Sequence, residues 1–204
     1  DWFATAEAAL EGGADCLQLR EKDLPDRELL GRARRLGDFC REHGALFIVN
    51  DRPDLAVLSG ADGVHLGQDD VTVSQARRIM PSTAIIGVST HTLEQFDEAI
   101  AQAPDYIALG PMFPTATKPQ DYVAGPEMLA EASSRTSLPL VAIGGINNAN
   151  AGQVLSRAWC SLCVCSAVVA QTDVAAATAR LSAVLDRGAG PVAPDTRPSG
   201  ASSV

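Results

Sequence analysis

The loop that follows the apolar run Tyr106–Leu109 carries residues that could bind an anion. The run has the β-branched and aromatic content of a strand, and a Gly-Pro pair and a second proline then break the chain. The hydroxyls of Thr115 and Thr117 and the amine of Lys118 follow. Hydroxyl, backbone N–H and ammonium groups all donate hydrogen bonds to phosphate oxygens. Taken alone, these residues fit a phosphate-binding loop and an ordinary polar surface loop equally well.

Two aspartates follow neighbouring apolar runs and could share a metal ion. Asp51 comes after Leu46–Val49, and Asp70 comes shortly after Gly63–Leu66. Adjacent strands lie about 4.8 Å apart, so carboxylates at their ends can meet. Carboxylates without a supporting cysteine and histidine set favour Mg²⁺ over Zn²⁺, and phosphate oxygens and water usually complete such a site. On spacing alone Asp69 could replace Asp70, and Asp51 could instead cap the helix that follows it.

A second group of donors ends the run Cys16–Leu19. Gln18, Arg20 and Lys22 alternate along the chain, which places them on one side of an extended segment. Two cations and an amide there could hold a polyphosphate, and a solvated, charged strand end is the simpler alternative. Ser89, which follows a later apolar run, is a candidate polar contact to a substrate.

The last two apolar runs are followed by Gly145 and by Cys165 and Ser166. In a (β/α)₈ barrel the loops after the last two strands are the usual phosphate site, and glycine permits close approach of the backbone. A plain glycine turn is the alternative. Cys160, Cys163 and Cys165 are predicted to be small buried side chains rather than metal ligands, because no fourth ligand stands nearby.

The histidines are not predicted to carry the chemistry. His65 lies inside an apolar run, which indicates a core histidine with satisfied hydrogen bonds. His91 could act as a general base, but its position indicates a surface loop, and His43 is expected on a helix surface.

The elements that must position these residues are short apolar runs alternating with amphipathic stretches, which predicts βαβ units and a covered parallel sheet. The predicted strands are 16–19, 46–49, 63–66, 84–88, 106–109, 140–143 and 162–165. The predicted helices include 1–10, 26–43, 74–80, 93–102, 127–134, 150–157 and 174–185. Seven strands preceded by a helix predict a (β/α)₈ TIM barrel whose first strand lies upstream of Asp1. We expect one domain over residues 1–186 and a disordered tail over 187–204, which is rich in Pro, Gly and Ser.

Composition narrows the class of protein. The chain has 204 residues and a net charge of −9, which disfavours a nucleic-acid or anionic membrane surface. Its apolar runs are too short to span a bilayer. Five cysteines, an odd number, do not indicate a disulfide framework, so a reducing cytoplasm is expected. The sequence leaves the oligomeric state open, including a homo-oligomer.

Taken together, the motifs resemble those of the thiamine phosphate synthase family over roughly residues 4–185. Several motifs in one order are far more specific than any single motif. They are Gln-Leu-Arg-Glu-Lys at 18–22, Val-Asn-Asp at 49–51, Gly-Val-His-Leu-Gly-Gln-Asp-Asp at 63–70, Gly-Val-Ser at 87–89, Gly-Pro-Met-Phe-Pro-Thr-Ala-Thr-Lys at 110–118 and Ile-Gly-Gly-Ile at 143–146.

The resemblance implies a transferase that joins a hydroxymethylpyrimidine pyrophosphate to a thiazole phosphate and releases pyrophosphate with Mg²⁺. It implies Mg²⁺ ligands at Asp51 and Asp70, and roles in catalysis for Arg20, Lys22 and Lys118 in neutralising the leaving group. The implied contacts to the pyrimidine pyrophosphate are Gln18, Leu19, Arg20, Glu21, Lys22, Asn50, Ser89 and Lys118. The implied contacts to the thiazole phosphate are Thr115, Ala116, Thr117, Gly145, Cys165 and Ser166.

The chain departs from the family pattern in two places, and rival readings stay open. The family has a strand before the helix at Asp1, and it has Ala-Gly-Ala-Asp-Gly where this chain has Arg157–Ser161, a change that could displace the backbone leading to Cys165. An impaired, non-catalytic binder of thiamine-pathway phosphates is therefore one alternative. A thiazole tautomerase or regulatory paralogue on the same barrel is another, as is an isomerase or aldolase with a phosphate site.

Overall fold

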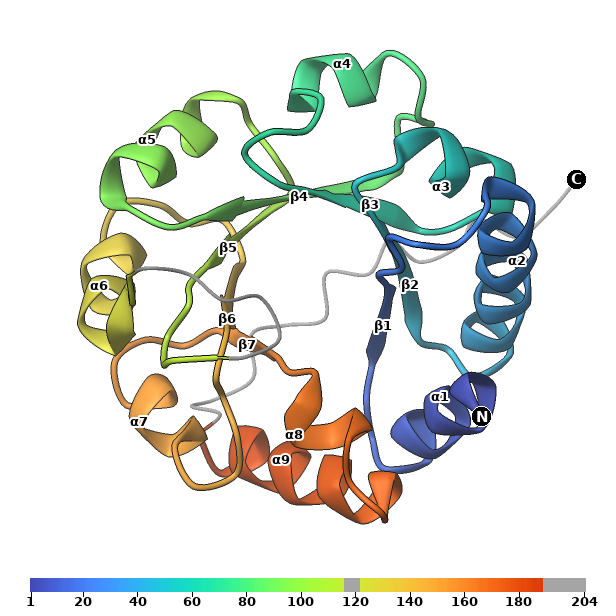
Figure 1. Ribbon diagram of the computed structural model, residues 1–204. Helices are drawn as coiled ribbons and strands as arrows, with labels where there is room; N and C mark the ends of the chain where they lie inside the picture. The colour runs from blue at the N-terminus through green and yellow to red at the C-terminus, as the bar shows by residue number, and fades with distance from the viewer. Residues whose placement is uncertain (116–121, 189–204) are drawn as a thin grey trace, which may run out of the picture.

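Seven parallel strands form one curved sheet, and the helices lie around its outside (Figure 1). The structure is a computed structural model that describes residues 1–115 and 122–188. The strands pair in the order β1 Cys16–Leu19, β2 Leu46–Asn50, β3 Gly63–Leu66, β4 Ile85–Thr90, β5 Tyr106–Leu109, β6 Leu140–Ile143 and β7 Ser161–Cys163. The helices are α1 Trp2–Glu11, α2 Asp26–Glu42, α3 Pro53–Ser59, α4 Val73–Arg77, α5 Leu93–Ala101, α6 Gly125–Ser133, α7 Ala151–Leu155, α8 Ser166–Val169 and α9 Val174–Gly188.

The predicted α/β architecture is confirmed. Apolar residues fill both faces of the central strands, and all four residues of β3 are buried because one face of the sheet packs inward and the other meets the helices. Every strand lies within two residues of its predicted bounds. The last helix, α9, runs through Arg187 and Gly188, two residues beyond the predicted domain end. The rest of the predicted tail lies outside the described residues.

The two edge strands, β1 and β7, lie at opposite ends of the strand order, and no pairing joins them in the described part of the chain. The first and last long helices close the ring on the outside instead (Figure 1). A Cβ on Gly12 would lie 2.4 Å from the carbonyl oxygen of Ala175, and the hydroxyl of Ser182 donates to the carbonyl of Gly13. The absence of a side chain at Gly12 therefore lets α1 pack directly on α9.

Because all seven strands are parallel, their carboxyl ends lie at one rim of the sheet. The loops after each strand therefore meet there, and these loops contain the residues selected from the sequence. None of the described helices is long and apolar enough to cross a membrane.

Candidate active site at the carboxyl ends of the strands

The turn after β2 holds Asp51 in a conformation that is unusual for a residue with a side chain. Its φ is 63°, in the left-handed region, where an L-residue loses of the order of 1 kcal/mol. The N–H of Asp51 donates to the carbonyl of His65 (2.8 Å), and the N–H of Arg52 donates back to the carbonyl of Asn50 (2.8 Å). The N-cap residue of α3 is Arg52, so the alternative prediction that Asp51 caps this helix is wrong.

Asp70 lies beside Asp51. The N–H of Gly67 donates to Oδ2 of Asp70 (2.7 Å), which fixes the carboxylate at the end of β3. Partial burial raises the pKa of Asp70, and the neighbouring Asp51 raises it further. The Nζ of Lys22 lies 3.5 Å from Oδ2 of Asp51 and lowers the pKa of Asp70. It is Asp70, rather than Asp69, whose carboxylate interacts with Asp51.

This pair of carboxylates has the chemistry of a Mg²⁺ site that a substrate completes. Two like charges in contact repel each other, and a divalent cation between them would remove that repulsion. Within residues 1–115 and 122–188, no group of three or more His, Cys, Asp or Glu could enclose a metal. A metal at Asp51 and Asp70 would therefore keep positions for phosphate oxygens and water.

The donors at the end of β1 lie next to this pair. Gln18 is half-buried within the strand, and Arg20 and Lys22 are exposed beyond it. The side chain of Arg20 makes no hydrogen bond or ion pair with any residue that the structure describes, so its guanidinium is available to a ligand. Glu21 instead faces α2, where its carboxylate lies 3.6 Å from Arg32, and the side chain of Leu19 is part of the core.

Ser89 is held by a chain of hydrogen bonds that sequence reasoning missed. The Nε2 of His65 lies 2.7 Å from Oγ of Ser89, and its Nδ1 lies 2.8 Å from the hydroxyl of Tyr106. Burial raises the pKa of Tyr106, so the phenol keeps its proton, and either tautomer of the imidazole maintains both bonds. Gly87 makes room for the ring, because a Cβ there would lie 1.9 Å from Cζ of Tyr106. The prediction that His65 is a buried, satisfied histidine is confirmed.

The loops after β5 and β6 form one unit. The N–H of Met112 donates to the carbonyl of Ile143 (2.9 Å), and the N–H of Phe113 donates to that of Gly144 (3.1 Å). Gly145 has φ 67°, and a Cβ on it would lie 2.6 Å from the carbonyl oxygen of Phe113. Thr115 is half-buried at the end of this unit. Ala116, Thr117 and Lys118 lie outside the described residues.

Cys165 and Ser166 are exposed where β7 passes into α8. Cys160 is buried as predicted, but Cys163 is only partly buried and Cys165 is exposed, so the prediction of three buried cysteines is wrong for these two. The strand shortens to three residues and the backbone turns at Cys165, which lifts its side chain out of the core. Despite the changed sequence at 157–161, Ser161, Leu162 and Cys163 pair with β6 in parallel register.

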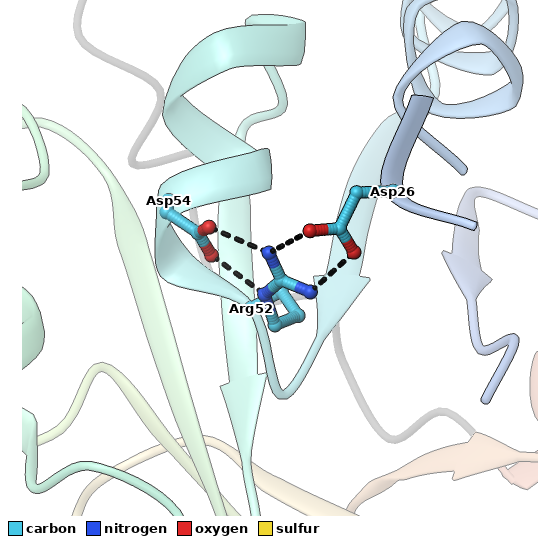
Figure 2. Close-up of polar contacts among 3 residues, drawn as sticks. All are labelled: Asp26, Arg52 and Asp54. Carbon is cyan, nitrogen blue, oxygen red and sulfur yellow. Dashed lines mark hydrogen bonds and ion pairs between the residues drawn. The ribbon is translucent and has the colours of Figure 1, made fainter. Parts of the chain in front are cut away.

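A charged cluster beside Asp51 was also missed (Figure 2). The guanidinium of Arg52 lies between the carboxylates of Asp26 and Asp54. Its hydrogen bonds hold the pKa of both carboxyls below the usual range and raise the pKa of Arg52 itself. The only local signal in the sequence was an arginine directly after the Asn-Asp turn and two residues before another aspartate.

Known proteins resemble this chain over most of its length. The family model for thiamine monophosphate synthase matches residues 1–168. The thiamine-phosphate synthase of Methanocella arvoryzae is 46% identical over 183 residues, which cover 89% of this chain and 86% of that protein. A thiamine-phosphate synthase of Prochlorococcus marinus (strain MIT 9303) is 44% identical, but the matched region is 51% of its length.

Two solved structures have folds similar to that of this chain. The thiamine phosphate pyrophosphorylase from Pyrococcus furiosus has a TM-score of 0.86 at 39% identity, over 92% of this chain and 90% of that one. A phosphoribosyl anthranilate isomerase from Thermotoga maritima has a TM-score of 0.69 at 15% identity, over 90% of this chain and 94% of that one. The second likeness is one of fold alone.

Proposed function

Because the chain belongs to the thiamine monophosphate synthase family and has the activity of a thiamine-phosphate synthase, we propose the reaction and the residues as follows. The substrates are a hydroxymethylpyrimidine pyrophosphate and a thiazole phosphate. The C–O bond to pyrophosphate breaks with its electron pair on the leaving group, and the thiazole nitrogen then forms the new C–N bond. The observation that carries the proposal is the contact between Asp51 and Asp70 beside Lys22.

In this proposal the metal side of the site stabilises the departing pyrophosphate. Asp51 and Asp70 would hold Mg²⁺, which is typical of the family, and the metal supplies positive charge to the phosphate oxygens. Arg20 and Lys22 add two cations from the exposed end of β1. Fixed positive charge where negative charge develops is the main source of rate in such a reaction. Lys118 is proposed to add a third cation, on the basis of the sequence motif.

The pyrimidine is proposed to be held by Gln18, Asn50 and Ser89. Support comes from the bonds that orient Ser89, since the imidazole of His65 fixes its hydroxyl at 2.7 Å. The electron-rich aminopyrimidine can carry the positive charge after the C–O bond breaks, so no protein nucleophile is needed. We therefore assign no covalent intermediate to the protein.

The thiazole phosphate is proposed to bind where the loops after β5, β6 and β7 meet. Backbone N–H groups near Gly145 and the hydroxyls of Thr115 and Ser166 would donate to the phosphate. The close packing of Gly145 on the loop after β5 supports the proposal, because it brings these two loops into one surface. Ala116, Thr117 and Cys165 are assigned to the same phosphate by the sequence motifs.

The decisive experiment is pyrophosphate release from purified protein given both substrates, with and without Mg²⁺. Release that requires all three components is the expected result. Release without Mg²⁺ would contradict the metal assignment. Binding of both substrates without release, in protein shown to be folded by circular dichroism, would identify a non-catalytic binder instead.

A further inference from the structure

Arg52 connects three segments that carry the candidate site. Its Nη1 donates to Oδ1 of Asp26 (2.9 Å), the first residue of α2. Its Nε and Nη2 donate to the carboxylate of Asp54 (2.9 and 2.7 Å), in the first turn of α3. Arg52 itself follows Asp51 directly in the chain. The start of α2, which ends the loop bearing Lys22, is thereby tied to the turn bearing Asp51. Figure 2 shows Arg52 between Asp26 and Asp54.

The bonding of the guanidinium indicates that it does not itself bind a substrate. An arginine has five N–H donors. A further bond joins Nη2 to Oδ2 of Asp26 (3.3 Å), so each of the three nitrogens donates to a carboxylate. Within the described part of the chain, these bonds use four of the five donors and leave one N–H on Nη1. A phosphate approaching this guanidinium would be repelled by two carboxylates, which favours a structural role for Arg52 over ligand binding.

Its contribution to folding is expected to be small. The side chains of Arg52, Asp26 and Asp54 are 38%, 70% and 50% exposed. Ion pairs as exposed as these contribute little to the free energy of folding, because water screens them and long side chains lose freedom. The cluster instead fixes the relative positions of its members, since the planar guanidinium of Arg52 holds the two carboxylates in one orientation.

The turn at Asp51, next to this cluster, has a backbone conformation that must be held in place by other contacts. Asp51 occupies the left-handed region without being a glycine, so nearby non-left-handed conformations are available to it at lower backbone energy. Two backbone hydrogen bonds hold the turn from inside the sheet. The side-chain bonds of Arg52 hold the residue directly after Asp51 from outside the sheet, so they restrain the same turn.

We propose that Arg52 is a positioning residue for the pyrophosphate half of the reaction, which rests on the proposed function. Through Asp26 and Asp54 it keeps the Asp51 carboxylate and the Lys22 loop at the spacing that a metal-bound pyrophosphate requires. It touches neither the metal nor the substrate. Residues of this kind change metal affinity when replaced, although they are not ligands.

The chain offers a matched control in Arg135. Its Nη1 donates to Oδ2 of Asp97 on α5 (2.6 Å), and its Nη2 pairs with Glu131 on α6. Its side chain is 31% exposed, close to the value for Arg52. Arg135 follows α6 and precedes β6, at the end of the sheet away from the strand carboxyl ends. Arg52→Met and Arg135→Met therefore remove equivalent clusters, one beside the site and one far from it.

The test measures binding of inorganic pyrophosphate by calorimetry over a series of Mg²⁺ concentrations, together with Tm and steady-state kinetics. For Arg52→Met we expect the Mg²⁺ concentration at half-maximal binding to rise about 10- to 100-fold. The KM for the thiazole phosphate should change little. Arg135→Met should leave both quantities unchanged, with a similar small shift in Tm. Arg52→Lys, which keeps the charge without the fork, should fall between Arg52→Met and the parent chain.

Equal Mg²⁺ dependence in the parent chain and Arg52→Met would overturn the inference, as would an equal change in Arg135→Met. If Arg52→Met does not fold, Asp54→Asn replaces it, because this variant removes one side of the cluster and should raise the Mg²⁺ requirement in the same direction. Failure of the parent chain itself to bind pyrophosphate with Mg²⁺ would instead contradict the proposed function.

Discussion

The two sides of the rim are held by different kinds of interaction. After the ligands proposed for them, we name residues 18–22, 50–54 and 67–70 the metal side and residues 111–115, 143–146 and 165–166 the phosphate side. On the metal side, charged side chains fix one another, as in the contacts Lys22–Asp51 and Arg52–Asp54. On the phosphate side, backbone bonds and glycines fix the loops.

The difference follows from what each side is proposed to bind. A metal and a leaving pyrophosphate need several charges at set positions. Ion pairs hold Lys22 and Arg52 in place, while the guanidinium of Arg20 stays available to the ligand. A phosphate bound by N–H groups needs room close to the backbone, which a glycine provides. Substitutions that remove charge should therefore damage one side, and substitutions that add volume should damage the other.

Asp51→Asn should have the largest effect. Asparagine is isosteric and tolerates the left-handed region, so the turn should keep its shape while one carboxylate is lost. We expect kcat for pyrophosphate release to fall about 100- to 1,000-fold at fixed Mg²⁺, as for the loss of a group that stabilises charge directly. Thermal unfolding serves as the control for folding. A rate within threefold of the parent would contradict the metal site.

Gly145→Ala tests the phosphate side. The new Cβ would meet the carbonyl oxygens of Phe113 and Pro114 at 2.6 and 2.7 Å, at a φ of 67°. The loop must shift, at a cost of about 1–3 kcal/mol. The expected result is a KM for the thiazole phosphate raised about 10-fold, with the Mg²⁺ dependence unchanged. The control is Gly152→Ala in α7. Among the described residues, no atom outside the adjoining stretch of this helix lies within 4 Å of the new Cβ, and Tm should be unchanged or higher.

If Gly145→Ala raised the Mg²⁺ requirement and left the thiazole phosphate KM alone, the division into two sides would be wrong. The same would hold if Gly152→Ala reproduced the change in KM.

Tyr106→Phe tests whether the hydrogen bonds that orient Ser89 affect binding of the pyrimidine pyrophosphate alone. It removes the 2.8 Å bond to Nδ1 of His65 and leaves the ring over Gly87 in place. One hydrogen bond is worth about 1 kcal/mol, so kcat/KM for the pyrimidine pyrophosphate should fall about fivefold. Parallel measurement with the thiazole phosphate varied should show little change. An equal loss for both substrates would indicate a general effect on folding rather than on the orientation of Ser89.

The strands could be predicted because each is a short apolar run between glycines, prolines and charges. The exception is β7, where Cys163, Val164 and Cys165 continue the apolar pattern although the strand ends at Cys163. Sequence pattern cannot show that the backbone turns there into α8. Cys165 was therefore expected inside and lies at the surface.

The position of the candidate residues that follow a strand could be predicted in the same way, since the strand end fixes their place at the rim. The Arg52 cluster could not, because Asp26 lies 26 residues away and only the packing of α2 beside β2 brings the two together. The left-handed turn at Asp51 was equally hidden, since Asn-Asp after a strand is also typical of a helix cap. Long-range contacts between charged groups leave no periodic signal in a sequence.

The smallest expected effect is that of Asp70→Asn on the stability of the metal-free protein, where the sign of the change separates stability from function. The raised pKa of Asp70 means that its charged form is less favourable in the folded protein than in the unfolded chain. Asp70 therefore stabilises the folded protein only while its carboxyl is protonated. This contribution is fully present below the pKa of the carboxyl in the unfolded chain, about 3.9. It is lost as the pH rises through the higher pKa of Asp70 in the folded protein. In metal-free protein at pH 7, Asp70→Asn should therefore be more stable than the parent, while the amide oxygen still accepts from Gly67.

The gain should be no more than about 1 kcal/mol, since the carboxylate is partly exposed to water. Urea unfolding in EDTA at pH 7 and at pH 3 measures it, and the two proteins should converge at pH 3. Added Mg²⁺ should reverse the order at pH 7, because only the parent has both carboxylates for the cation. A variant less stable than the parent in EDTA would mean that the Asp51–Asp70 contact is not repulsive, and that Lys22 already neutralises the pair.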